Sequence, residues 1–220
     1  MCGRYTLTAT PDQLALHFDA TLPQDFSPRF NAAPTQQLPV LLNKDPHQFE
    51  MLRWGLVPSW SKGIDNKYSM INARSETLTE KPSFKKALEQ RRCIVPADSF
   101  YEWKKLDDGT KQPMRITLKD EDLFAFAGLW DTWKSPDGGI IRSFTIITTD
   151  ANDLMRPIHD RMPVILSREA EKRWLDDQTD LSGLTTLLRP FSPEQMRAYP
   201  VSKRVNGANI DEPSLIMPVH

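Results

Sequence analysis

The sequence predicts an α+β protein in which short helices surround a curved, barrel-like antiparallel β-sheet. Segments rich in β-branched and aromatic residues follow one another through the middle of the chain, and turn signals such as Asp107-Asp108-Gly109 and Pro136-Asp137-Gly138-Gly139 separate them. Eighteen prolines indicate many fixed loops rather than long helices. The 220 residues are enough to bury a sizeable core, and no linker or repeat divides them. We therefore expect one domain over residues 1–220.

The first third of the chain combines one helix, two strands and a long loop. Thr10-Pro11-Asp12-Gln13 predicts a helix start, with threonine as the cap, proline at the first helical position and Gln13 completing a capping box. Leu38–Leu42 and Phe49–Trp54 are predicted strands around a turn at Asn43–His47. Residues 55–80 have little periodicity and are predicted to form a long ordered loop, a feature that is often functional.

The middle of the chain predicts an antiparallel meander. A short helix at Ser83–Arg92 has an apolar face and a basic face. The strands expected after it are Cys93–Pro96, Phe100–Lys104, Met114–Lys119, Leu123–Trp130 and Ile140–Thr148. Successive strands with short connections favour antiparallel neighbours. The remaining expected elements are a strand at Val164–Leu166, a capped helix at Ser167–Asp176, a short helix at Ser192–Met196 and a closing strand at Tyr199–Ser202.

Composition excludes several classes of protein. No apolar run approaches the ~20 residues that span a bilayer, and no leader peptide is recognisable, so we expect a cytoplasmic protein that does not contact membranes. Cys2 and Cys93 do not make a disulfide framework, and the scattered histidines lack metal-ligand spacing, so no metal or cofactor is expected. The net charge of −1 argues against bulk electrostatic coating of duplex DNA but allows a local basic groove.

Cys2 directly follows the start methionine, and a small residue in this place favours removal of Met1. Cys2 would then carry a free α-amine and a thiol on one carbon framework. The amine of such a 1,2-aminothiol attacks an aldehyde to give an imine, and the thiol closes onto the imine carbon to give a thiazolidine. An α-amine titrates near ~7.8, so an appreciable fraction is unprotonated at neutral pH. The alternative is a chance surface cysteine.

Two further segments hold groups suited to chemistry at such a cysteine. In Ile71–Glu76, Asn72 can hold a sugar or a carbonyl, and the planar fork of Arg74 can bind a phosphate. The alternative is a turn amide and an Arg74–Glu76 surface pair. In Phe100–Trp103, Glu102 lies among aromatics and shares a strand face with Phe100, which favours a raised pKa and a role as general acid or base. The alternative is a solvated glutamate.

His159 lies in a patterned loop, His159-Asp160-Arg161-Met162-Pro163, and histidine is the natural proton shuttle near neutral pH. The alternative is an incidental surface histidine.

Aromatic and basic residues together indicate a groove for single-stranded nucleic acid. Trp60 and Trp103 can stack on bases, while Arg4 and Arg74 can bind phosphates. The basic residues Lys81, Lys85, Lys86, Arg91 and Arg92 can extend this groove, or they can be a solvated helix face.

The combination of these segments resembles the SRAP family, the SOS-response-associated peptidases or abasic-site processing proteins. The resemblance rests on Cys2–Tyr5, Asn31–Pro34, Trp54–Pro58, Ile71–Glu76, Arg92–Ala97, Phe100–Trp103, Ala127–Trp130 and His159–Val164. It implies a DNA-damage response protein that recognises abasic sites in single-stranded DNA and joins them covalently to Cys2 as a thiazolidine. It also implies possible self-processing peptidase, hydrolase and lyase activity.

Matched position by position, the resemblance assigns catalytic roles to Cys2, Asn72, Glu102 and His159. It assigns DNA contacts to Arg4, Trp60, Arg74 and Trp103. The expected partner is single-stranded DNA containing an abasic site. We expect a monomer without cofactor, cytoplasmic and associated with the nucleoid when it acts on DNA.

Three other functions remain open. An N-terminal-nucleophile hydrolase such as a glutamine amidotransferase would use the Cys2 amine as base for its own thiol, without crosslinking DNA. A cysteine peptidase would use Cys2 with His159 and Asn72. A plain single-strand-binding module would carry out no chemistry.

Overall fold

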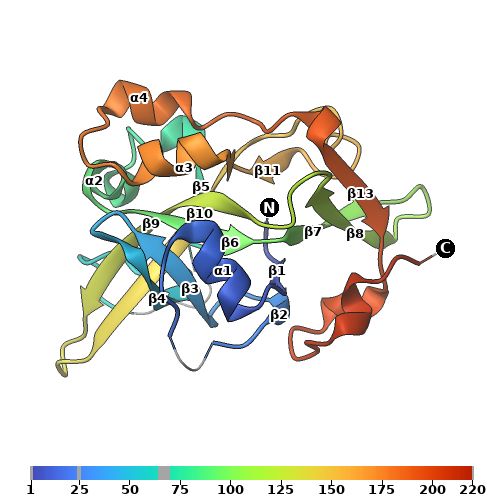
Figure 1. Ribbon diagram of the computed structural model, residues 1–220, viewed down its shortest axis with the longest axis horizontal. Helices are drawn as coiled ribbons and strands as arrows, with labels where there is room; N and C mark the ends of the chain where they lie inside the picture. The colour runs from blue at the N-terminus through green and yellow to red at the C-terminus, as the bar shows by residue number, and fades with distance from the viewer. Residues whose placement is uncertain (1, 24–25, 64–69, 220) are drawn as a thin grey trace.

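Five strands close into a β-barrel at the centre of the molecule (Figure 1). The computed structural model describes residues 2–23, 26–63 and 70–219. The barrel strands are β3 (Gln37–Leu42), β4 (Asp45–Trp54), β6 (Arg92–Ala97), β9 (Phe124–Lys134) and β10 (Ile140–Asp150). They pair in the order β10-β4-β3-β6-β9, and β9 pairs with β10 to close the ring. All of these pairs are antiparallel except β4–β10, which is parallel at Ser143↔Arg53 and Phe144↔Trp54.

A second sheet stands beside the barrel and contains the N-terminal strand (Figure 1). Its order is β13-β8-β7-β1-β2, and every pair in it is antiparallel. The strands are β1 (Tyr5–Leu7), β2 (Arg29–Ala32), β7 (Ser99–Lys105), β8 (Lys111–Leu118) and β13 (Met196–Pro200). Because β6 and β7 are separated by Asp98 alone, the chain passes directly from the barrel into this sheet.

Three short strands extend the barrel. β5 (Asn72–Arg74) pairs with β10 in parallel, β11 (Arg161–Pro163) pairs with β10 antiparallel, and β12 (Ile165–Leu166) pairs with β9. β5 and β11 both reach Thr148 of β10, through Arg74 and Pro163 respectively. The end of β10 therefore lies between the segments that carry Asn72 and His159.

The helices lie outside the sheets and are short (Figure 1). They are α1 (Pro11–Phe18), α2 (Pro82–Gln90), α3 (Arg168–Leu175) and α4 (Leu181–Thr186), with 3₁₀ turns η2 (Ser75–Thr77), η3 (Pro193–Gln195), η4 (Lys203–Asn206) and η5 (Pro213–Ile216). At the start of α1, the Gln13 N–H donates to the Thr10 hydroxyl and the Thr10 N–H donates to the Gln13 side chain, which is the predicted capping box. In the described part of the chain, no helix combines the length and apolarity that crossing a membrane requires.

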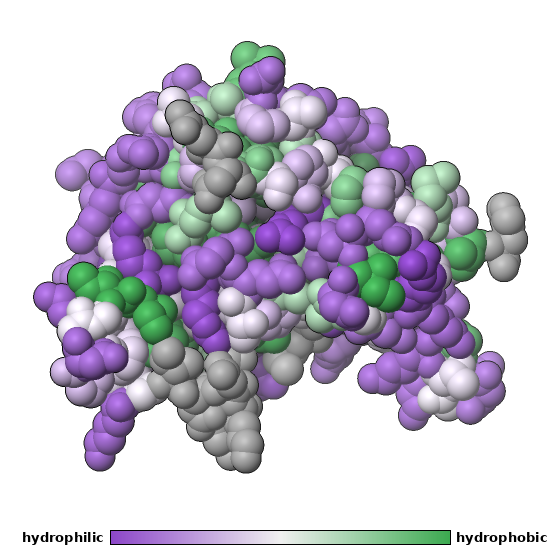
Figure 2. All heavy atoms as spheres, turned by 90° about the horizontal axis from the view of Figure 1, so that it is seen from below, coloured by the Kyte–Doolittle hydropathy of each residue, from purple (hydrophilic) through white to green (hydrophobic). Residues whose placement is uncertain are grey.

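The main core lies in and around the barrel, where Trp54, Phe126 and Phe144 are almost fully buried. A smaller cluster of Tyr101, Val201, Val205 and Leu215 joins the second sheet to the C-terminal segment. Seen from below, the described surface is mostly hydrophilic and its apolar side chains form small separate patches (Figure 2). The apolar residues thus gather inside, and Gly128 shows how tightly: a Cβ there would lie 2.8 Å from the Cys93 Sγ and 2.9 Å from the Thr145 carbonyl oxygen.

The predicted α+β class with a barrel-like core is confirmed, but the predicted meander is wrong in its pairing. β6, β9 and β10 lie in the barrel, whereas β7 and β8 lie in the second sheet, because a one-residue connection at Asp98 leaves no room for a hairpin.

Several predicted boundaries also move. The Asn43–His47 turn is shorter, since β4 begins at Asp45; Ser192–Met196 is the 3₁₀ turn η3 followed by β13; and β5 and η2 interrupt the predicted loop 55–80, of which residues 64–69 lie outside the described residues.

Arg92 is not part of a basic surface, contrary to one alternative above, because its side chain is 1% exposed. Its guanidinium donates to the carbonyl oxygens of Leu88 (3.1 Å) and Glu89 (2.6 Å) in α2, and to those of Trp174 (2.7 Å) and Asp176 (3.0 Å) at the end of α3. Carbonyls at a helix C-terminus have no partner within the helix, so Arg92 satisfies the ends of both helices. Arg91 is withdrawn as well, since it pairs with Asp131 at 3.2 Å.

We predict that Arg92→Leu lowers the free energy of unfolding by roughly 3 kcal/mol or more, because several buried carbonyl groups lose their donors. Urea denaturation followed by far-UV circular dichroism measures the change. Lys86→Ala is the control, because the exposed Lys86 on the same helix should change stability by no more than about 0.5 kcal/mol. Equal stability of Arg92→Leu and the wild-type protein would contradict the capping role.

Candidate active site

Strand pairing holds Cys2 inside the protein. The N–H of Tyr101 donates to the carbonyl of Arg4 (3.0 Å) and the N–H of Asp98 donates to that of Thr6 (3.0 Å), which fixes β1 against β7. Cys2 immediately precedes this strand and is completely buried. Its Sγ lies 4.0 Å from the carbonyl oxygen of Arg4. The alternative of a chance surface cysteine is therefore wrong.

The surroundings of Cys2 keep its sulfur protonated. Burial raises the pKa of the Cys2 thiol above its ordinary value, and the negative charge of Glu102 raises it further. Because the thiolate is the nucleophilic form, the cysteine is not activated in the way of a cysteine peptidase, where neighbouring positive charge lowers the thiol pKa.

Glu102 faces the interior from the second sheet. Alternation along β7 places Phe100 in the main core and Tyr101 in the smaller cluster, and Glu102 is 2% exposed. Burial raises its pKa, and the proximity of His159 acts in the opposite direction. The alternative of a solvated glutamate is wrong. Glu102 acts electrostatically on both Cys2 and His159, so these three groups lie in one neighbourhood.

His159 precedes β11, and its side chain is 28% exposed. Its Nδ1 accepts the backbone N–H of Arg161 at 3.0 Å and lies 2.9 Å from the Asp160 Oδ1. An imidazole whose Nδ1 accepts a hydrogen bond carries its proton on Nε2 when it is neutral. When it is protonated, Asp160 can take the Nδ1 proton. The ring therefore has a partner in either charge state.

Asn72 lies in β5, and its amide group is only partly satisfied. The Nδ2 group donates to the carbonyl of Ile71 at 2.9 Å, whereas the Oδ1 is buried and has no partner among the described residues. The Nε1 of Trp54 donates to the same carbonyl at 3.0 Å, and the Trp54 ring packs on Tyr5 with 5.3 Å between centroids. Through these contacts the strand that follows Cys2 meets the strand that carries Asn72.

The four predicted DNA-contacting residues lie in two kinds of environment. Trp60 is 64% exposed and Arg74 is exposed in β5. Arg4 is half-buried and donates to the carbonyls of Val205 (2.8 Å) and Asn206 (3.4 Å), while the Nε1 of Trp103 donates to the Asn206 Oδ1 at 2.7 Å. Arg4 and Trp103 thus also hold η4 against the second sheet.

Sequence reasoning missed the residues that connect these groups. Tyr5 and Trp54 lie inside the protein, and Glu76 pairs with Arg161 at 2.8 Å rather than with Arg74. The available signal was that all four belong to motifs with a suspected functional residue, Cys2–Tyr5, Trp54–Pro58, Ile71–Glu76 and His159–Val164. The partners are more than 40 residues apart in sequence, so no local pattern reveals their contacts.

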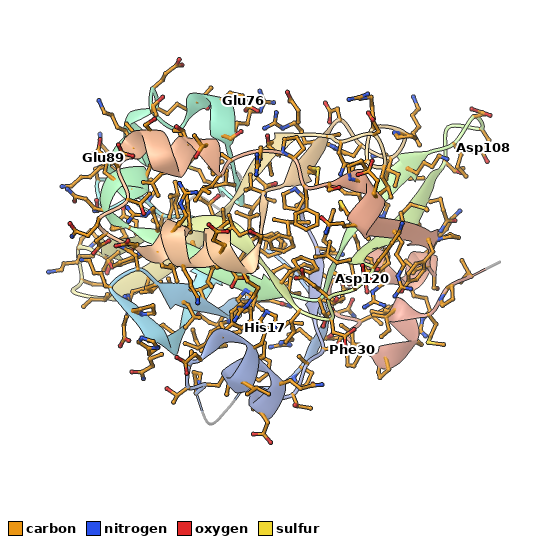
Figure 3. The ribbon with its side chains drawn as sticks, turned by 45° about the horizontal axis from the view of Figure 1, so that its top comes forward. His17, Phe30, Glu76, Glu89, Asp108 and Asp120 are labelled. Atoms are coloured by element: carbon orange, nitrogen blue, oxygen red, sulfur yellow. The ribbon has the colours of Figure 1, made fainter. Side chains whose placement is uncertain are left out.

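A cleft of about 900 Å³ lies apart from this site, and none of the four candidate catalytic residues lines it. His17 of α1 and Asp120 of the β8–β9 connection line it, whereas Glu76 of η2 lies near the opposite edge of the molecule (Figure 3). Arg168 and Arg197 stand there with the acidic Asp120–Asp122 turn, so the lining carries both signs of charge.

The sequence is similar to proteins named for abasic site processing. The sequence model of the SOS response associated peptidase (SRAP) family matches residues 1–208. The chain is 50% identical to the abasic site processing protein YoqW of Bacillus subtilis, over 98% of this chain and 99% of that one. It is 34% identical to the abasic site processing protein HMCES of Xenopus tropicalis, over 97% of this chain and 77% of that one.

Solved structures show the same fold. A protein from Bacteroides thetaiotaomicron superposes with a TM-score of 0.91 at 27% identity, over all of both chains. One from Bordetella bronchiseptica gives a TM-score of 0.80 at 27% identity, over 91% of this chain and all of the other.

We predict that Glu102 lowers stability as the pH rises. Because its pKa is raised in the folded protein, the unfolded chain loses this proton first, and the wild-type protein loses stability as the pH rises above about 4.3, the ordinary value for glutamate. Glu102→Gln removes this loss, so its advantage in free energy of unfolding should be larger at pH 8 than at pH 4. Urea titrations at both pH values measure it, and parallel pH curves for the two proteins would refute the raised pKa.

Proposed function

This chain belongs to the SRAP family, and we propose on that premise that it acts in the DNA-damage response by recognising abasic sites and shielding them through Cys2. The observation that carries the proposal is the buried Cys2 beside the buried acid Glu102. An abasic site presents an aldehyde, and the α-amine and thiol of an N-terminal cysteine form a thiazolidine with an aldehyde. The relatives named for abasic site processing extend over nearly the whole chain, which supports the same substrate here.

The reaction requires that the sugar open first. A base removes the proton of the anomeric hydroxyl, the bond between C1′ and the ring oxygen breaks, and an acid protonates that oxygen, which frees the aldehyde. We propose that Glu102 and His159 share these transfers. The raised pKa of Glu102 brings it closer to neutrality, where a group can both give and take a proton. The buried Oδ1 of Asn72 has an acceptor position for a sugar hydroxyl.

Ring closure follows from the amine. The Cys2 nitrogen attacks the aldehyde carbon, loss of water gives the imine, and the sulfur then adds to the imine carbon while the thiol proton moves to nitrogen. The net change joins aldehyde and aminothiol with release of one water. A protonated thiol suits this order, since it waits for the imine and supplies the proton. The raised pKa of the thiol also disfavours the alternative of an N-terminal-nucleophile hydrolase, which needs a ready thiolate.

Removal of Met1 is a condition of this chemistry, because the amine of Cys2 is otherwise an amide. Met1 lies outside the described residues. We propose that Met1 is removed before the protein acts, and that any autoproteolytic, hydrolase or lyase activity uses the same Cys2 neighbourhood.

Single-stranded DNA is the proposed form of the substrate, with the chain acting as a monomer in the cytoplasm or at the nucleoid. The exposed Trp60 offers a surface for base stacking and the exposed Arg74 a contact for a phosphate. The candidate catalytic residues all come from one chain, so the proposed reaction needs no second copy.

A denaturing gel tests the crosslink. We expect purified wild-type protein mixed with abasic single-stranded DNA to give a band that survives heating, and mass spectrometry to show that Met1 is absent. Cys2→Ala keeps the amine but loses the thiol, so it should give a band only when borohydride reduces the imine. Cys93→Ala is the matched control, because Cys93 is equally buried and should crosslink like the wild-type protein. A heat-stable band from Cys2→Ala without reductant would contradict the proposal.

Trp60→Ala should weaken binding to abasic single-stranded DNA by about 1–3 kcal/mol, the usual contribution of one stacked base. Fluorescence anisotropy with labelled DNA measures the dissociation constant. Leu16→Ala is the control, since Leu16 is 88% exposed but lies in α1 at the cleft described above. Equal affinities of Trp60→Ala and Leu16→Ala would remove Trp60 from the binding surface.

A further inference from the structure

We propose that Arg161 is a positioning residue that holds His159 and the strand of Asn72 in their working arrangement. The inference rests on the proposed function, because it concerns the same site. Arg161 is the first residue of β11 and lies two residues after His159. Its side chain is 12% exposed.

The guanidinium of Arg161 bridges three chain segments. Its Nη1 and Nη2 donate to the Glu76 Oε1 and Oε2 at 2.8 and 3.0 Å, in the bidentate geometry that makes arginine–carboxylate pairs strong and directional. Nη1 also donates to the Asp150 Oδ1 at 2.6 Å, and Nη2 to the carbonyl of Thr148 at 2.8 Å. Partial burial alone would raise the pKa of Glu76, but the hydrogen bonds from Arg161 outweigh it, and the pKa is lowered.

These bonds hold elements that have little else to hold them. β5 and β11 are three residues long, so each has only a few backbone hydrogen bonds to β10. The Arg161 side chain starts in β11, contacts the end of β10 and reaches Glu76 in η2, directly after β5. The two strands that flank β10 are thereby joined to each other as well as to β10.

The backbone of Arg161 connects this bridge to the chemistry. Its N–H donates to the Nδ1 of His159 at 3.0 Å, which leaves the Nε2 of a neutral imidazole as the donor. The side-chain bonds determine where this N–H points. Arg161 therefore fixes both the position and the tautomer of His159 without being a catalytic residue itself.

Substitution should show the role in the rate of reaction rather than in affinity. At saturating abasic single-stranded DNA, we expect the first-order rate of crosslink formation to fall roughly tenfold or more in Arg161→Gln and severalfold in Glu76→Gln, since small displacements of reacting groups are costly. The double variant should react no more slowly than Arg161→Gln alone, because both changes break one interaction. Arg156→Gln is the matched control: Arg156 pairs with Asp153 at 2.9 Å in the same connection, where both side chains are largely exposed.

Arg161→Lys separates this role from a direct phosphate contact. Lysine keeps the charge that a phosphate requires but cannot form the fork to Glu76, so Arg161→Lys should be slow with an unchanged dissociation constant. A normal rate in Arg161→Lys, together with weaker binding in Arg161→Gln, would overturn the proposal and make Arg161 a DNA contact.

Nitrogen-15 NMR of the histidine rings tests the bridge without any reaction. In the wild-type protein at neutral pH, His159 should show Nδ1 as the acceptor and Nε2 as the protonated nitrogen. Glu76→Gln and Arg161→Gln should shift it toward a mixture of tautomers. Failure of the wild-type protein to crosslink would refute the proposed function and leave this measurement intact, whereas unchanged His159 signals in both variants would refute the bridge. If Arg161→Gln does not fold, Glu76→Gln decides, since the Glu76 side chain is 46% exposed.

Discussion

The pairing of β1 with β7 is the constraint on which the site depends. It is short, with Tyr5 opposite Phe100 and Thr6 opposite Ser99, yet it places the first residues of the chain between a barrel and a second sheet. Most chain ends lie at the surface and are poorly ordered unless a sheet or a docked segment fixes them. Here β2 covers the other side of β1, and Arg4 secures η4 from the C-terminal part of the chain. A terminal amine and thiol thus become interior groups, with a fixed acid beside them.

The site belongs to neither sheet alone. Cys2 and Glu102 come from the second sheet, whereas Asn72 and His159 come from segments that flank β10 of the barrel. The arrangement survives only if the two parts keep their relation, and the Tyr5–Trp54 ring contact with the Trp54–Ile71 hydrogen bond provides that relation inside the core. Motifs spread over the whole chain are the consequence, because each supplies either a reacting group or the contact that aligns it.

Local signals predicted what is local. The capping box at Thr10 and Gln13, the turn before β10 and the inward face of Glu102 follow from residue chemistry and from the alternation of a strand. The parallel β4–β10 seam and the Arg161–Glu76 pair do not, since each joins residues far apart in sequence. Arg92 misled for a related reason: beside Arg91 it has the pattern of a basic surface, and only the convergence of the α2 and α3 ends makes its burial favourable.

The electrostatics of the site favour chemistry by the amine before the thiol. A buried thiol beside a buried carboxyl group would meet like-charge repulsion if both were ionised, so the thiol remains protonated while Glu102 exchanges its proton more easily. An internal cysteine in this environment would be inert. A terminal cysteine differs, because the amine can take the first step and the thiol then closes the ring without first having to become a free thiolate. The burial that makes the sulfur a poor nucleophile for hydrolysis is therefore compatible with thiazolidine formation, and it excludes competing water from the bond that is formed.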